Sequence, residues 1–238
     1  MDDCNVRILR HMTEKLTSTR TALLRVAEQL IAVGGVAGPS DREIIAAANV
    51  GNKSAIRYHF GSRRGLVDAI LADHGEVLEV RRALAFAELT VDRATTDLFR
   101  LSRVVVEPYA SFLADGPSQW AYLAVAQSVM EDPHEQLDDL AARFKDPLIL
   151  GLVDLMLAQI ALPSELAAER VLVGISQVIA SIGARARQQL VGAGRRPLTR
   201  IDIFSTNLVD MLHGSMTAPA AAATLRAIGS GAASEVGA

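Results

Sequence analysis

The sequence has few of the residues that cross-link or stiffen a small fold. Its 238 residues include one cysteine, Cys4, and aromatic residues make up 4% of the chain. A single cysteine excludes an internal disulfide and any zinc site built from several thiolates. The first twenty residues mix acids, bases and isolated apolar residues, so they lack the apolar core of a secretory signal. Together with the scarcity of cysteine, this predicts a cytoplasmic protein.

The chain also lacks the patterns that mark sheets and the common enzyme sites. No stretch alternates as a half-buried strand does, and there is no glycine-rich phosphate-binding loop. The five histidines are scattered, and the E-x-x-H pair Glu131 and His134 spans Pro133, which breaks the helix that this spacing needs. We therefore predict no metal, no cofactor and no catalytic site. The alternative is a helical-bundle enzyme that binds a phosphorylated substrate.

Aliphatic residues are what the sequence has in quantity. Half of the residues are hydrophobic, mainly Ala, Leu and Val, which favours helices over sheets. Apolar residues recur at helical spacing along most of the chain. The longest apolar stretch, residues 171–184, is bounded by arginines, which indicates a buried helix rather than a membrane span. The sequence therefore predicts an all-α protein with no membrane partner.

Charge is distributed unevenly along the chain. Residues 1–66 hold ten Lys and Arg and six Asp and Glu, a balance of +4, whereas residues 67–238 hold fourteen and twenty-one, a balance of −7. The two balances give the net charge of −3. A basic N-terminal quarter on an acidic remainder is typical of a protein that touches a polyanion with one end only.

Three helix signals follow one another near the N-terminus. Residues 17–34 carry apolar side chains on one helical face and end at two glycines. Ser40 and Glu43 match the S-x-x-E capping box and predict the start of a second helix. Asn49 tolerates left-handed backbone and predicts a turn, after which residues 53–60 form a third helix. Two short helices joined by a tight turn and preceded by another helix make a helix-turn-helix.

Basic, polar and aromatic side chains gather in the stretch GNKSAIRYHFGSRRG, residues 51–65, which contains no acid. The last helix of a helix-turn-helix can enter the major groove of double-stranded DNA, where arginine bonds guanine and other polar side chains reach base edges or phosphates. Ile56 and Phe60 would anchor this helix inward. These residues predict contacts to DNA from Lys53, Ser54, Ala55, Arg57, Tyr58 and Arg63.

The stretch REIIAAANVGNKSAIRYHFGSRRGLVDAIL resembles the DNA-binding segment of TetR-family transcriptional regulators, and the resemblance covers about residues 19–71. It implies an all-helical homodimer whose first three helices read a palindromic operator. It also implies a larger domain in which a small ligand usually releases the DNA. By this resemblance Ser40, Arg42 and His59 would also contact the DNA backbone. Two features depart from the family's commonest pattern: the turn is one residue longer, and Arg57 stands where a tyrosine is common.

Residues 66–216 would supply dimerisation and ligand sensing if the resemblance holds. Two heptad-like apolar seams predict long helices that pair across a twofold axis or face the chain's own core. The predicted dimer interface consists of Val171, Ile175, Val178, Ile182, Ile201, Phe204, Leu208 and Met211. Mostly apolar segments with few polar groups suit a hydrophobic or amphipathic effector. The predicted ligand contacts are Arg103, Glu107, Tyr109, Trp120 and Gln127.

The predicted organisation has four parts: an N-terminal arm (1–16), a helix-turn-helix domain (17–65), a ligand-binding and dimerisation domain (66–216) and an Ala/Gly/Ser-rich tail (217–238). We expect the tail to be disordered and the arm to offer basic residues to the minor groove. The predicted function is that of a ligand-released transcriptional repressor. An architectural DNA-binding protein without ligand sensing is a second alternative.

Overall fold

A computed structural model describes residues 3–91, 96–131, 148–192 and 198–235. Within these ranges the chain is all-α, as the sequence predicts, and no strand is present. Its helices are α1 (Asp3–Gly34), α2 (Asp41–Ala47), α3 (Ala55–Phe60), α4 (Arg63–Val91), α5 (Leu98–Asp115), α6 (Pro117–Met130), α8 (Leu148–Leu157), α9 (Ser164–Val191), α10 (Ile201–Thr217) and α11 (Ala222–Glu235).

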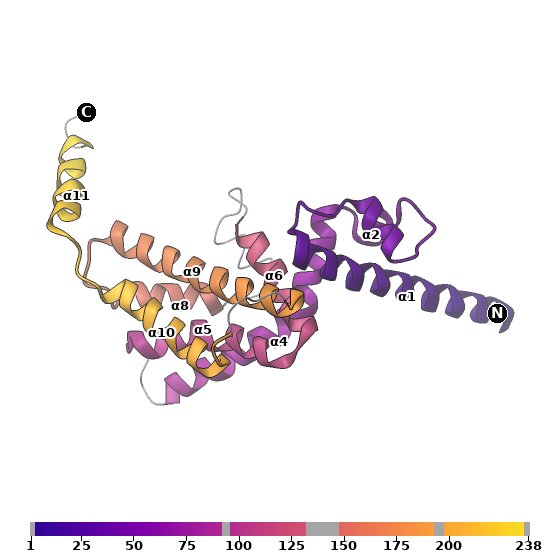
Figure 1. Cartoon of the computed structure of the whole chain (residues 1–238), viewed down its shortest axis with the longest axis horizontal. Helices are drawn as coiled ribbons and strands as arrows, with labels where there is room; N and C mark the ends of the chain where they lie inside the picture. Colours follow the sequence, from indigo (N-terminus) through magenta and orange to yellow (C-terminus); the bar gives the residue numbers. More distant parts are fainter. Residues whose placement is uncertain (1–2, 92–95, 132–147, 193–197, 236–238) are drawn as a thin grey trace.

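The helices are arranged as a small unit at one end and a larger body (Figure 1). Helices α1, α2 and α3 form the small unit, and α4 begins beside them and continues into the body. In the body α9 packs against α6 and α10, while α10 also packs against α5. The two ends of the chain lie at opposite extremes of the molecule. Helices α1 and α4 both contact other helices of the body.

Helix α9 is the core helix of the body. Its length and composition would allow it to cross a bilayer, with a mean hydropathy of 1.4, but 44% of that apolar window is buried inside the protein. Val171, Ile175, Val178 and Ile182 all point into this chain's own core. The prediction that this seam forms the dimer interface is therefore wrong. A heptad-like seam needs a helical neighbour, and here α6 and α10 of the same chain provide it.

Two glycines allow α9 to approach its neighbours closely. A Cβ atom on Gly183 would lie 2.4 Å from Gln127 Cβ on α6. A Cβ atom on Gly174 would lie 2.7 Å from Leu212 Cδ1 on α10. The second predicted interface seam lies on α10. Its Leu208 is buried, Ile201 and Phe204 are half-buried, and Met211 is exposed. Small residues in α9 thus serve packing within one chain.

Both terminal segments are more helical than the sequence predicts. The arm, residues 1–16, is part of α1 from Asp3 onward, and α1 runs without interruption to Gly34. The tail, residues 217–238, was expected to be disordered, but it contains α11. Alanine has the highest helix propensity of any residue, which accounts for a helix in this Ala-rich segment.

Candidate nucleic-acid interface

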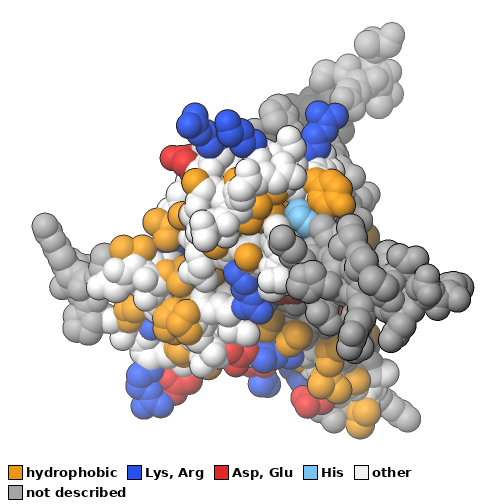
Figure 2. Space-filling model, turned by 90° about the vertical axis from the view of Figure 1, so that its right-hand side faces the viewer, with side chains coloured by type: hydrophobic (Ala, Val, Ile, Leu, Met, Phe, Trp, Pro, Cys, Tyr) orange, Lys and Arg blue, Asp and Glu red, His pale blue; other side chains and the backbone are white. Residues whose placement is uncertain are grey.

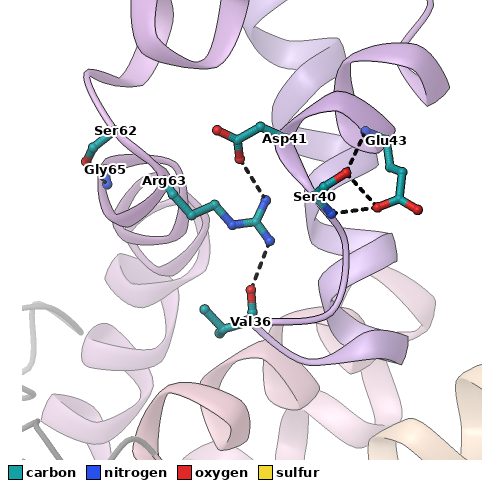
Figure 3. Close-up of polar contacts among 7 residues, drawn as sticks. All are labelled: Val36, Ser40, Asp41, Glu43, Ser62, Arg63 and Gly65. Atoms are coloured by element: carbon teal, nitrogen blue, oxygen red, sulfur yellow. Dashed lines mark hydrogen bonds and ion pairs between the residues drawn. The ribbon is translucent and has the colours of Figure 1, made fainter.

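The start of α2 is fixed by the capping box that the sequence predicts. The Ser40 amide donates to Glu43 Oε2 at 2.7 Å, and the Glu43 amide donates to Ser40 Oγ at 3.2 Å (Figure 3). The Ser40 hydroxyl also donates to Glu43 Oε2 at 2.7 Å. These hydrogen bonds lower the pKa of Glu43 below its usual value. The box holds α2 against the turn that precedes it, and it leaves Arg42 exposed beside it.

The turn between α2 and α3 is built from two asparagines. Asn49 has a φ of 54°, the left-handed geometry that the sequence predicts there. Asn52 Oδ1 accepts a hydrogen bond from the Ser54 amide at 2.9 Å. This bond keeps Lys53 and Ser54 in the turn, so α3 begins at Ala55, two residues later than predicted.

The inward and outward faces of α3 are clearly separated. Ala55 and Ile56 are buried, with exposures of 1% and 2%, so Ile56 anchors the helix as predicted. Ala55 was predicted to touch DNA, which its burial prevents. Arg57 is exposed, and Tyr58 exposes 66% of its surface.

A basic face results, which we define as the exposed side chains of Arg42, Lys53, Arg57 and Tyr58. Within the described part of the chain, no acid forms an ion pair with its three cations. Figure 2 views the molecule from the end that carries α1 to α3. Lys and Arg side chains lie along the upper edge of that view, near a histidine and exposed hydrophobic side chains.

Arg63, at the start of α4, has a different environment from the one predicted. Its guanidinium donates to Asp41 Oδ1 at 3.4 Å and to the Val36 carbonyl at 3.0 Å, as Figure 3 shows. Burial lowers the pKa of Arg63, and the nearby carboxylate of Asp41 opposes that effect. Arg63 therefore joins α4 to α2 and to the turn after α1, whereas the sequence predicted a DNA contact.

His59 lies at the edge of the basic face, half-buried between two rings. Its ring is 5.0 Å from that of Tyr58 and 6.3 Å from that of Phe60, measured between centroids. Burial, and then the positive charge of Arg20, lower the pKa of His59. A lowered pKa favours the neutral imidazole, which can donate or accept a hydrogen bond.

The turn after α1 also connects this region to the body. The Val36 amide donates to Ser128 Oγ on α6 at 2.9 Å. Arg187 Nε on α9 donates to the Ala32 carbonyl at 3.1 Å. Since Arg63 bonds the Val36 carbonyl, this turn contacts α4 and α6, and the end of α1 contacts α9. A shift of α6 or α9 would consequently reach the helix-turn-helix directly.

The chain is similar in structure to Salmonella enterica GusR. The two share 20% sequence identity with a TM-score of 0.40, over 83% of this chain and 95% of that one. No protein-family model matches the sequence, and no curated protein matches it.

The residues predicted to bind an effector lie on α5 and α6, and their role in ligand binding stays a prediction. Arg103 Nε donates to Glu107 Oε1 at 2.7 Å on the surface of α5. Trp120 Nε1 donates to the Leu113 carbonyl at 2.8 Å, and Gln127 Nε2 donates to a glutamate one turn later. Each of these donors has a partner within the protein.

The fifth predicted ligand contact, Tyr109, is almost fully buried in the core. Arg103 and Glu107 do share a shallow hollow between α4 and α5, together with Ala85, Glu88, Leu89, Arg100 and Val104. This hollow has charged residues on its walls, whereas the sequence predicted a mostly apolar cavity.

Sequence reasoning missed a polar group inside the body. Glu28 Oε1 of α1 lies 2.8 Å from His74 Nε2 of α4, and both side chains are nearly inaccessible to solvent. His74 packs on the buried ring of Tyr122 with centroids 5.0 Å apart. Arg82, also fully buried, lies over the Tyr109 ring at 5.0 Å. A signal was present in the sequence, because His74 and Arg82 continue the i, i+4 spacing of the apolar face of α4.

Proposed function

We propose that this protein is a sequence-specific DNA-binding transcriptional regulator. The observation that carries this proposal is the geometry of α3. Ala55 and Ile56 fix the helix to the core while Arg57 and Tyr58 project outward beside Lys53. A short helix held in this way, after a capped helix and a tight turn, suits insertion into the major groove. Arginine can then bond guanine O6 and N7 while lysine and tyrosine reach other base or phosphate atoms.

We further propose that the protein acts as a homodimer. The α9–α10 pair exposes apolar side chains that α6 and α5 do not cover: Leu172, Val173, Ile203 and Met211. The two helices run antiparallel, since Gly174 lies at Leu212 and Arg185 packs on Phe204. Two such pairs can form a four-helix bundle across a twofold axis. In a dimer, recognition helices about 34–36 Å apart would meet successive major grooves of a palindromic operator.

Repression relieved by a small hydrophobic or amphipathic effector, in the cytoplasm, is the regulatory mode that we propose. Two links between the body and the helix-turn-helix support it. One is the turn at Val36, which contacts Ser128 and Arg63. The other is the Glu28–His74 contact between α1 and α4. A ligand that displaced α4 or α6 would move both links and change the angle at which α3 is presented.

The test is a fluorescence-anisotropy titration with the DNA upstream of the protein's own gene, at two salt concentrations and against scrambled competitor. Tight binding that resists competitor, with two or more protomers per site, would support the proposal. Weak binding that competitor and salt abolish equally would contradict it, because only the sequence-independent attraction to phosphates would then be present.

A further inference from the structure

Arg20 of α1 lies against the end of α3, about forty residues away in the sequence. Its guanidinium carbon is 5.0 Å from the centroid of the Phe60 ring, and the arginine is exposed to solvent. Stacking on an aromatic face restrains a long side chain that would otherwise sample many rotamers. Arg20 is therefore presented in one place beside α3.

Arg20 and His59 both lie beside Phe60 at this end of the recognition helix. Arg20 offers its guanidinium and His59 its imidazole. The Tyr58 and His59 rings contact each other edge to face. Burial, and then the positive charge of Arg20, lower the pKa of His59. In the described part of the chain, no carboxylate forms an ion pair with Arg20.

This arrangement favours an anion that touches Arg20 and His59 together. Two cationic groups held close repel each other, which disfavours protonation of the imidazole in the free protein. A phosphate between them removes that repulsion and accepts hydrogen bonds from both. Arginine suits this role because its planar fork matches the geometry of phosphate oxygens.

We infer that Arg20 and His59 together bind one phosphodiester of the DNA backbone, so that the DNA-binding surface extends from α3 onto α1. The inference rests on the proposed function. It adds a contact from α1 to those that the sequence predicts. Since a phosphate contact carries no base preference, Arg20 acts in positioning the protein on any duplex.

The test compares Arg20→Gln with Arg25→Gln, using cognate and random duplexes at 50 and 200 mM salt. Arg25 is a matched control because it is exposed on the same helix but faces α6, where its Nη1 lies 3.5 Å from Ser118 Oγ. One lost phosphate contact lowers the salt slope by about 0.9, so the ratio of affinities at the two salts should shrink roughly threefold for Arg20→Gln. Arg25→Gln should leave the ratio unchanged.

A second measurement is independent of DNA affinity. Arg20→Gln should raise the pKa of His59 in the free protein, followed by NMR titration of the imidazole, because a neighbouring positive charge is removed. Adding random duplex to the wild-type protein should also raise this pKa. Arg20→Lys, which keeps the charge, should retain the salt slope even if it loosens the stack on Phe60.

The outcomes separate the inference from the proposed function. If the wild type binds duplex DNA but Arg20→Gln retains the full salt slope, the Arg20 contact is overturned and the regulator proposal stands. If the wild type binds no duplex at either salt, both are overturned. A His59 pKa that does not respond to duplex would exclude His59 from the phosphate site.

Discussion

Arg57 and Arg63 lie within seven residues of each other, yet the fold gives them different surroundings. Arg57 projects from α3 into solvent, whereas Arg63 exposes only 25% of its side chain and bonds Asp41 and Val36. An exposed guanidinium keeps its five donors for a ligand, while a bonded one orders the protein around it. The two arginines are therefore expected to differ in what their loss affects.

Arg57→Ala should weaken binding to the cognate operator by about 1–3 kcal/mol and relax the preference at one base position, as expected for a bidentate contact to guanine. Anisotropy titrations against operators substituted at each position would measure this. Arg42→Ala is the matched control, since an exposed arginine at the start of α2 should affect all sequences alike. Equal losses on cognate and random DNA would instead make Arg57 a phosphate contact.

Arg63→Ala should lower the free energy of unfolding by about 1–2 kcal/mol, because it removes a charge-assisted bond to a partly buried carbonyl and an ion pair open to solvent. Urea denaturation monitored by circular dichroism measures the change. Asp41→Ala, which removes the ion pair alone, should cost less. Unchanged stability with reduced DNA affinity would restore Arg63 to the set of direct DNA contacts.

At the scale of single elements, the closest packing in the body is between α6 and α9. Gly183 lets the two helices meet at Gln127, whose Cβ would lie 2.4 Å from an added methyl group. In contrast, Gly151 of α8 has no atom within 4 Å of the position of a Cβ. The two glycines are thus in helices of one body but under opposite steric constraints.

Gly183→Ala should destabilise the protein by about 1–3 kcal/mol through overpacking against α6, despite the better helix propensity of alanine. Gly151→Ala should be neutral or stabilising by up to about 1 kcal/mol, because propensity acts there without a clash. Thermal melts of both variants test the pair. A Gly183→Ala variant as stable as the wild type would show that α6 and α9 separate easily.

Elements set by local chemistry could be predicted from the sequence, and those set by distant partners could not. The Ser40–Glu43 capping box and the Asn49 turn follow from side-chain bonds within a few residues, and both are present. The apolar seam on α9 predicts that this face of the helix is packed. It does not predict which helix packs there, because a helix of the same chain or of a second chain can bury the seam equally well.

The same limit applies at the candidate site. Ala55 shares its helix with Arg57, and only the docking of α3 on the core decides that Ala55 is buried. Arg20 could not be assigned to the site because its neighbour Phe60 lies forty residues away and meets it only in the folded chain. The burial of His74 likewise depends on a contact from α1.

At the scale of the whole molecule, the exposed apolar side chains of the α9–α10 pair carry the dimer proposal. Leu172 and Ile203 expose about half of their surfaces, at 49% and 54%. Leu84 of α4 is more exposed still, at 63%, but lies outside that pair. An acidic side chain introduced at these positions would disrupt a dimer interface, whereas ordinary exposed surface would tolerate it.

Ile203→Glu combined with Leu172→Glu should convert the protein to a monomer, because two acids per protomer would be buried in an apolar bundle. Light scattering after size-exclusion chromatography would report the mass, and operator binding should weaken at the same time. Leu84→Glu serves as the control and should leave the mass unchanged. A dimer that survives the double substitution would place the twofold contact elsewhere.

Helix α4 is one uninterrupted helix of 29 residues, which begins shortly after α3 and ends in the body. Each residue adds about 1.5 Å of length and 100° of rotation. A single insertion between residues 75 and 80 would turn the basic face through roughly that angle relative to the body, and it would pull Val36 from Ser128 and α1 from Arg187. The length of α4 is therefore under a stricter constraint than its exposed surface, which can change residue by residue without altering the direction in which α3 points.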